Sequence, residues 1–326
     1  MVPVKATCMQ MCPKDEITMR KSRKLLHQLE RDPYQMVKCF SRSAAGCSLN
    51  KPHLLRPPSV LMNTISYLLN DVLKIVNVPF NIIYDFIDDR LSAIKQDATI
   101  QEVSKQNWMN ILPPIIRFYA YAAYMCYEYN INIYDPYLNM KHFHECVLKF
   151  IKICLEDSNE TTTDELCSEM VSLLIVANLG DYNVLQQGLP FISKKNNLVK
   201  KTMLLSVNIM NGNFGDLLKV YNELPAIHQC VISVQLPILR KYILQSMCFG
   251  FNCKNNFFPI SILTNCLLLN NDKETTEVCK HYGILMIDYK AELSKSLFNI
   301  EVDEPRIRKK IQFNVNVSTM ILHKQK

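Results

Sequence analysis

Glycine is scarce in this chain and is spread thinly along it. Only seven glycines occur among 326 residues, and no two of them form a phosphate-binding cluster such as GxGxxG or GxxxxGK(S/T). Barrels and sandwiches need many tight turns with positive φ, a conformation that glycine adopts most readily, so the same scarcity disfavours them. The sequence therefore excludes dinucleotide-binding and P-loop folds and predicts a fold built from long helices.

The overall composition is that of a globular protein with a large core. Apolar residues make up 48% of the chain, and its length suggests about two domains. The thirteen cysteines are scattered and odd in number, and the N-terminus lacks the apolar stretch of a secretory signal. The longest uncharged run, residues 255–271, contains Pro259 and several asparagines, so no membrane span is predicted. We expect a soluble protein of the nucleus or cytoplasm.

Charge is divided unevenly along the chain. Residues 1–60 carry 11 Lys and Arg against 4 Asp and Glu, and residues 290–326 carry 8 against 4, which gives +7 and +4. Residues 61–289 carry 18 against 22, which gives −4. A mildly acidic body with basic ends favours contacts with phosphates or acidic proteins at the ends.

Periodic apolar residues predict a series of helices in the first half of the chain. The expected helices are a basic one over 13–30, an antiparallel pair over 61–76 and 80–94, and others near 104–130, 138–155 and 163–178. Pro113, Pro114 and Pro136 are expected to interrupt the later helices, because proline is not tolerated in an α-helix interior. Residues 31–58 are rich in serine and proline and are predicted to form a loop.

A weak internal repeat follows these helices. Residues 173–190 resemble residues 204–225, and Gly180 aligns with Gly212 at a period of 32. A period in the thirties made of a helix, a tight turn and a second helix is typical of a tetratricopeptide-like (TPR-like) solenoid, in which each helix pair buries its apolar face on the next. Such stacks serve as scaffolds.

After Pro237 the pattern changes to short helices followed by two segments rich in β-branched residues. The segments LMIDYK (285–290) and IQFNVNVSTMI (311–321) are predicted to be strands. Three short helices followed by a small β-ribbon predict a winged helix. The expected division is an N-terminal basic helix and extended segment over 1–58, a helical-repeat domain over 59–236 and a winged-helix domain over 237–326.

Residues with catalytic or metal-binding chemistry are few. The close cysteine and histidine clusters at 8–12 and 142–146 lack a second pair at zinc-finger spacing, so core packing is the preferred interpretation and no metal or cofactor is predicted. No GxSxG motif occurs, and the enzymatic alternatives are a cryptic Cys/His site and paired-carboxylate catalysis at the acidic cluster described next. An acidic cluster at Asp85, Asp88 and Asp89 beside Arg90 is interpreted as solvated or partner-facing. The sequence thus predicts no catalytic residues.

Two patterns suit nucleic-acid binding. Seven tyrosines between 119 and 137 could stack bases, but their spacing of about three favours packing between helices. Six basic residues are candidates for phosphate contacts because they fall where a wing is expected. They are Lys290, Lys295, Arg306, Arg308, Lys309 and Lys310.

Four ordered motifs within about 100 residues carry a family resemblance. They are CMQMCP (8–13) followed by Glu16 and Arg20, VKCFSRSAAG (37–46), LRPPSVLMNTISYLLNDV (55–72) and YDFIDDRLSAIKQDATIQ (84–101). Together they resemble the SAC-three/GANP (germinal-centre-associated nuclear protein) family. Met9, Leu91 and Lys95 depart from the family pattern, and the chain looks like a short, single-domain animal member.

The resemblance implies a function as well as a fold. Family members are mainly α-helical, with TPR/PCI-like helical repeats before a winged helix, and are non-enzymatic. The resemblance implies pairing with a PCI-domain partner through the winged helix, together with a small acidic Sem/DSS-type peptide, and RNA binding in mRNA export or transcription-coupled processing. The alternative that it implies is a centrosome or mitotic-spindle protein acting in centrosome duplication without RNA.

Overall fold

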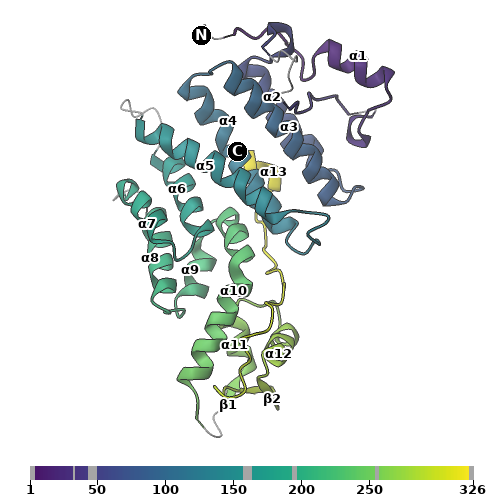
Figure 1. The fold of residues 1–326 in the computed structure, drawn as a ribbon. Helices are drawn as coiled ribbons and strands as arrows, with labels where there is room; N and C mark the ends of the chain where they lie inside the picture. The colour runs from purple at the N-terminus through teal and green to yellow at the C-terminus, as the bar shows by residue number, and fades with distance from the viewer. Residues whose placement is uncertain are drawn as a thin grey trace. The chain divides into compact units, whose positions relative to one another are not determined.

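The protein is mainly helical and has one small antiparallel sheet, as a computed structural model shows (Figure 1). The structure describes residues 4–31, 34–42, 50–156, 164–192, 197–253 and 257–322. The predicted fold class, mainly α-helical with a small β-ribbon, is confirmed. The chain forms two compact units: unit 1 comprises residues 1–122, 141–162 and 315–326, and unit 2 comprises residues 123–140 and 163–314. The boundaries predicted at 58 and 236 stay predictions.

Unit 1 is built on long amphipathic helices. Its elements are α1 (Lys14–Ser22), α2 (Pro58–Tyr67), α3 (Phe80–Ile100), most of α4 (Lys105–Met125), most of α5 (Pro136–Glu156) and α13 (Val317–Leu322). A π-helical turn over Leu68–Val72 continues α2, and short 3-10 turns lie at Gln28–Glu30 and Pro52–Leu54. On α3, Ile83, Ile87, Leu91, Ile94 and Ala98 form one buried stripe at helical spacing.

Helix α4 runs without a break through Pro113 and Pro114, so the predicted interruption there is wrong. A proline removes one N–H donor and crowds the carbonyl four residues earlier. Nearly every side chain from 111 to 124 is buried, and this packing outweighs the local loss. Pro136 does not interrupt a helix either, because it is the first residue of α5, a position that proline favours.

The tyrosine run packs against the protein's own interior. Tyr119, Tyr121, Tyr124 and Tyr134 are all buried, so the packing interpretation is confirmed for them. Tyr137 differs because it is 79% exposed.

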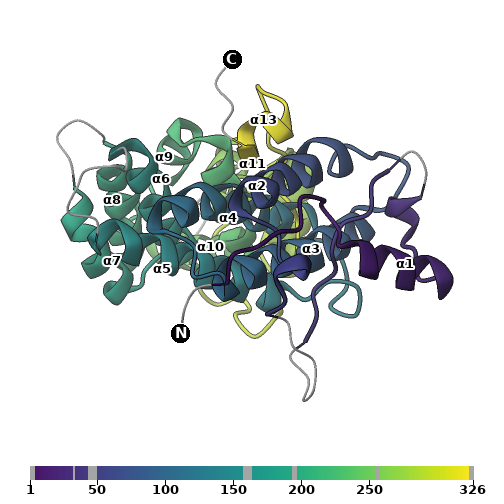
Figure 2. The same cartoon turned by 90° about the horizontal axis from the view of Figure 1, so that it is seen from above.

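Unit 2 contains the predicted helical repeat. Its helices are α6 (Asp164–Ala177), α7 (Tyr182–Gly188), α8 (Leu198–Met210), α9 (Leu217–Glu223) and α10 (Ala226–Gly250), with a 3-10 turn at Leu189–Phe191. Helices α6 to α9 lie side by side (Figure 2). Gly180 and Gly212 close equivalent turns with φ of +87° and +69°, the left-handed region that glycine tolerates. The repeat therefore consists of two helix-turn-helix units.

The end of unit 2 has the order of elements of a winged helix. It comprises β1 (Phe257–Pro259), α11 (Ile260–Cys266), α12 (Asp272–His281), β2 (Leu285–Ile287) and β3 (Lys290–Glu292), with strand order β1-β3-β2, all antiparallel. Asp288 and Tyr289 form the tight β2–β3 turn, the wing, and both have positive φ, as in the turns favoured by hairpins. Helix α10 leads into this group and runs unbroken through Pro237.

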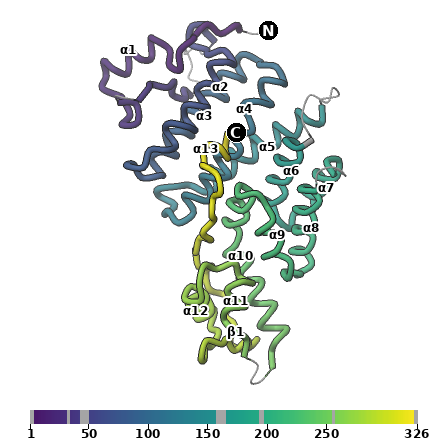
Figure 3. The backbone as a smooth tube through the Cα atoms, turned by 180° about the vertical axis from the view of Figure 1, so that it is seen from behind, coloured from purple at the N-terminus to yellow at the C-terminus, as the bar shows by residue number. Residues whose placement is uncertain are grey.

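The predicted strand over 311–321 is wrong. Residues 303–313 are extended but pair with no strand, and α13 begins at Val317. The segment runs beside α10 (Figure 3) and is held there by side chains: Arg240 donates to the carbonyl of Ile307 at 2.7 Å, and the Tyr124 hydroxyl accepts from the amide of Ile311 at 3.1 Å. The strand-like alternation of apolar residues in this segment therefore reflects packing on helices and not pairing with another strand.

Candidate functional site

Three of the four signature motifs meet at one buried aspartate. On α3, Asp97 accepts from Lys38 Nζ at 2.6 Å and from Arg56 Nε at 2.7 Å, one cation on each carboxylate oxygen. All three side chains are almost completely buried. Gln101, at the end of the same motif, donates to the carbonyls of both Arg56 and Asp97 at 2.8 Å. We call Lys38, Arg56, Asp97 and Gln101 the Asp97 cluster.

The first motif joins the same cluster through its backbone. The carbonyl of Met11 accepts from Arg56 Nη1 at 3.2 Å and from the amide of Lys38 at 3.0 Å. Segments that are far apart in the sequence are thus fastened to α3 by buried charges and carbonyls. These motif residues have a structural role, because their polar groups are used in contacts within unit 1.

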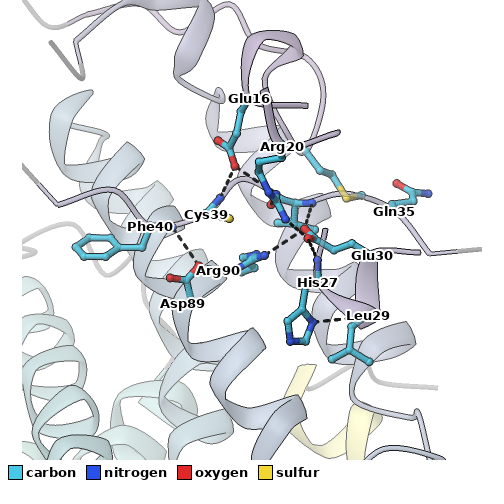
Figure 4. Close-up of polar contacts among 12 residues, drawn as sticks. Glu16, Arg20, His27, Leu29, Glu30, Gln35, Cys39, Phe40, Asp89 and Arg90 are labelled. Atoms are coloured by element: carbon cyan, nitrogen blue, oxygen red, sulfur yellow. Dashed lines mark hydrogen bonds and ion pairs between the residues drawn. The ribbon is translucent and has the colours of Figure 1, made fainter. Parts of the chain in front are cut away.

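A second buried ion cluster fastens α1 and residues 30–40 to α3 (Figure 4). Glu30 pairs with Arg20 through Oε2 and with Arg90 through Oε1, the latter at 3.2 Å, and its Oε1 also accepts from the amide of Val37 at 3.1 Å. Arg90 makes a further ion pair with Asp89 at 2.6 Å. We call Arg20, Glu30, Asp89 and Arg90 the Glu30 cluster.

The environment of Glu30 favours its ionised form. Burial by itself would raise the pKa of this carboxyl, but the charge of Arg90 and the hydrogen bonds from Arg20 and Val37 outweigh it, so the pKa is lowered. Sequence reasoning missed Glu30, which lies outside the quoted motifs. Its signal was weak: it is the only acid between residues 17 and 31, a stretch that carries five basic residues.

The acidic cluster on α3 is largely occupied by internal contacts. Asp88 accepts from the Tyr119 hydroxyl at 2.8 Å and lies 3.0 Å from His142 Nδ1, while Asp89 also accepts from the amide of Phe40 at 3.1 Å. The interpretation as solvated holds for Asp85, which is exposed, and in part for Asp89, whose side chain is 37% exposed, while Asp88 is mostly engaged within unit 1. The contacts of Asp88 and Asp89 position neighbouring segments.

The cysteine and histidine clusters do not combine into a metal site. Within the part of the chain that the structure describes, no group of three His, Cys, Asp or Glu side chains could hold a metal ion. Cys12 is buried, and burial raises the pKa of its thiol far above the ordinary value, which disfavours the thiolate that a metal needs. His142 is engaged by Asp88 instead.

The six predicted nucleic-acid residues are not equivalent in the structure. Lys290 begins β3 beside the wing, and Lys295 follows that strand with its Nζ 4.6 Å from the ring centroid of Phe249; both are exposed. Arg306 and Lys310 are exposed on the extended segment. Residues 306–310 were expected in the wing, and that placement is wrong, because the wing is the turn at 288–289.

Arg308 and Lys309 use their cationic groups within unit 2. Arg308 donates to the carbonyl of Met125 at 3.2 Å and lies over the Tyr124 ring at 5.3 Å. Lys309 donates to the carbonyl of Leu269 at 2.9 Å, and burial, followed by the charge of Arg240, lowers its pKa. These contacts fasten the extended segment, whereas the other four cations are exposed: Lys290, Lys295, Arg306 and Lys310.

The outer face of the winged-helix sheet carries exposed apolar side chains beside Lys290 and Glu292. Phe257 on β1 and Leu285 on β2 flank Glu292 of β3, and Ile287 is paired in register with Lys290. The three apolar side chains are between 37% and 49% exposed, and Tyr289 at the wing is 83% exposed. We call Phe257, Leu285, Ile287 and Tyr289 the sheet patch. Exposed apolar groups that cluster in this way mark interaction surfaces.

The four motifs and the winged-helix ending agree with comparisons to known proteins. The sequence profile of the SAC3/GANP family matches residues 11–288. This chain belongs to the SAC3/GANP family. Because the matched residues include both ion clusters and the sheet as far as Asp288, the buried motif contacts lie within the family's shared region.

Several curated relatives are similar at low identity. Protein xmas of Drosophila melanogaster is 21% identical over 300 residues, which is 85% of this chain and 14% of that protein. SAC3 family protein 1 of Schizosaccharomyces pombe is 24% identical over 328 residues, which is 89% of this chain and 31% of that protein. SAC3 family protein B of Arabidopsis thaliana is 28% identical over 159 residues, which is 45% of this chain and 9% of that protein. The chain thus spans less than a third of the length of each.

Among the described residues, no helix combines the length and the apolar character that crossing a bilayer requires.

Proposed function

We propose that this SAC3/GANP-family chain is a non-catalytic scaffold that pairs with a PCI-domain protein through its winged helix. The complex helps bind RNA in mRNA export or transcription-coupled processing, and includes a small acidic Sem/DSS-type peptide. It acts in the nucleus and cytoplasm. Family membership supports the scaffold role, and the sheet patch is the single observation that carries the pairing.

The sheet patch supports pairing because the described residues of unit 2 leave its side chains between 37% and 83% exposed. Phe257, Leu285 and Ile287 lie on the solvent side of a three-stranded sheet whose other face packs on α11 and α12. An exposed aromatic such as Tyr289 is a common anchor of protein interfaces. A second sheet or helix laid across this face would bury all four.

The pairing is tested by co-purification of the chain with a PCI-domain protein. Changing Ile287 and Tyr289 to Glu should lose the partner, because two carboxylates would then have to be desolvated in the interface, a cost that Lys290 opposite position 287 offsets only in part. The matched control changes Ile131 and Tyr182, which are 64% and 68% exposed in other parts of unit 2, to Glu. Retention of the partner by the patch variant, at the level of the control, would contradict the proposal.

RNA binding is supported by the four exposed cations near the winged helix. A quadruple change of Lys290, Lys295, Arg306 and Lys310 to Glu should weaken binding of a uridine-rich single strand by the purified complex. It should also reduce the slope of log affinity against log salt, since each lost phosphate contact lowers that slope by about 0.7. The control places the same charge change at four exposed lysines elsewhere: Lys74, Lys141, Lys152 and Lys219. If the partner binds but the complex has no affinity for RNA, the RNA half is refuted and the centrosome role is favoured.

A further inference from the structure

A groove in unit 1 is lined by flexible apolar side chains. It lies between residues 9–12, α1 and residues 34–36, and its volume is about 740 Å³, within the range of ligand-binding clefts. Its apolar lining residues are Met9, Met11, Ile17, Leu26, Tyr34 and Met36. Methionine side chains adapt to irregular apolar partners, and they are used at protein surfaces that dock helices. Met9 is 72% exposed, so part of this lining is open to a partner.

The rim of the groove is strongly basic. Residues 14–31 carry six Lys and Arg against three Asp and Glu. Lys21 and Arg31 line the groove and are exposed, as are Arg23 and Lys24 between them. The charge of the ligand is therefore expected to be negative.

Two of the three acidic residues in this stretch do not offset the positive charge of the rim. Glu30 lines the groove but is buried, and its two oxygens are taken by Arg20, Arg90 and the amide of Val37 (Figure 4). Glu16 accepts from Arg20 and from the amide of Cys39, the latter at 2.9 Å. A ligand carboxylate at the rim would thus face cations whose neighbouring acids are already engaged.

The walls of the groove are fixed before any ligand binds. The carbonyl of Met11 accepts from the Asp97 cluster through Arg56, and the amide of Gln35 donates to the Tyr67 hydroxyl at 2.9 Å. The Glu30 cluster joins α1 and residues 30–40 to α3. A site whose backbone is already ordered loses less conformational entropy on binding.

We propose that this groove is a docking site for an acidic amphipathic helix of a partner protein. The apolar floor takes the anchors of such a helix, at positions i, i+3 or i+4, and i+7, and the basic rim pairs with its carboxylates. A strand-like ligand is disfavoured because the described part of unit 1 contains no strand that it could extend. The site belongs to unit 1, whereas the residues on which the proposed function depends belong to unit 2.

Nucleic acid fits the groove less well than a helix. Base recognition on single strands relies on a series of aromatic platforms, and Tyr34 is the one aromatic side chain among the groove's described lining residues. Methionine, isoleucine and leucine instead provide the surface that leucine-type anchors need.

The test measures binding of a fluorescent synthetic helix to the full chain by anisotropy. The probe has about 18 residues, with Leu at the anchor positions and Glu elsewhere, and the counter-probe carries Lys in place of each Glu. We expect the acidic probe to bind and the basic one not to bind. Changing Lys21 and Arg31 to Glu should weaken binding roughly tenfold, since two exposed ion pairs are lost and two like-charge contacts replace them.

Matched variants separate the groove from general electrostatics and from misfolding. Lys74→Glu with Lys141→Glu makes the same charge change at other exposed positions and should leave the affinity unchanged. Met9→Glu tests the floor and should reduce binding of the acidic probe at least tenfold, with an unaltered thermal midpoint because Met9 is exposed. The proposal is overturned if the two probes bind equally, if Lys21 and Arg31 do not matter, or if a single-stranded RNA displaces the probe from the groove. Loss of this site would leave partner and RNA binding by the winged helix intact, so the two proposals fail separately.

Discussion

Asp97→Asn is expected to destabilise unit 1 severely. The side chain carries the only carboxylate within ion-pair distance of Lys38 and Arg56 in the described residues, with contacts of 2.6 and 2.7 Å. The amide keeps the shape but removes the charge, which leaves two cations buried without a counter-ion. Breaking a buried pair in this way costs about 3–5 kcal/mol. That is a large part of the roughly 5–15 kcal/mol by which a domain is stable.

The protein contains a convenient probe for this measurement. Trp108 is the only tryptophan of the chain, and it is buried on α4 in unit 1, with Lys149 Nζ 3.1 Å from its ring centroid. Urea unfolding followed by its fluorescence gives the free energy of unfolding of unit 1. The control is Asp85→Asn on the same helix, an exposed aspartate whose change should stay within about 0.5 kcal/mol. A loss below 1 kcal/mol for Asp97→Asn, with an unchanged m-value, would refute the reasoning.

A second variant separates unpaired charge from lost hydrogen bonds. Replacing Lys38 and Arg56 with Met and Asp97 with Leu removes all three charges together and keeps similar volumes. Apolar replacement of a whole buried ion cluster is often neutral or stabilising. We therefore expect the triple variant to be more stable than Asp97→Asn. If it is less stable, the hydrogen bonds to backbone carbonyls dominate.

Three further outcomes are expected. The pKa of Glu30 is lowered in the folded state, so the stability that its ionised form contributes is present above the unfolded pKa of about 4.3 and is lost as the pH falls through the folded pKa. Below pH 5, the Glu30→Gln variant should therefore lose less stability than the wild type, as measured by urea unfolding followed through Trp108 fluorescence. Gly283→Ala should lower the free energy of unfolding by about 1–3 kcal/mol, because φ is +80° and a Cβ would lie 2.5 Å from the Leu297 carbonyl oxygen. Thermal unfolding followed by circular dichroism measures the effect. The control is Gly250→Ala, where a Cβ meets open space, and it should be neutral or stabilising. Arg240→Met removes the hydrogen-bond donors to the carbonyls of Leu267, Leu268 and Ile307. Each carbonyl left without its donor costs about 1–3 kcal/mol of stability, so hydrogen exchange in residues 301–314 should become faster. Unchanged exchange would contradict the role of Arg240 in holding this segment.

The fold could be predicted from the sequence where local patterns and tertiary packing agree. Apolar periodicity located α2 and α3, and the aligned Gly180 and Gly212 located the repeat, because a glycine after a helix marks a left-handed turn. The winged helix was predicted from short helices followed by strands at LMIDYK and 311–321, but LMIDYK contains β2, the turn and the start of β3, and 311–321 is not a strand. Each of these signals lies within a few dozen residues, which is the range that pattern reasoning covers.

The errors arose where the deciding contact is distant in the sequence. Pro113 and Pro114 are tolerated because their helix is buried, and residues 311–321 lack a neighbouring strand; neither fact is visible locally. From the sequence alone, Arg308 and Lys309 were predicted to be available for phosphates, because the carbonyls that they contact lie far away along the chain. The motifs identified Arg56 and Asp97 as characteristic residues, but the sequence could not show that they pair with each other and with Lys38, because 59 residues separate Lys38 from Asp97.

The Asp97 cluster has a consequence for how chains of this kind can diverge. A single replacement that removes one of the charges at 38, 56 or 97 costs several kcal/mol, which takes up a large part of the stability of an ordinary domain. The three positions should therefore change together or not at all, while exposed positions drift independently. Among distant relatives, the identities at these sites are expected to covary as a block and so to preserve the ancestral attachment of the N-terminal segment long after the surface has become unrecognisable.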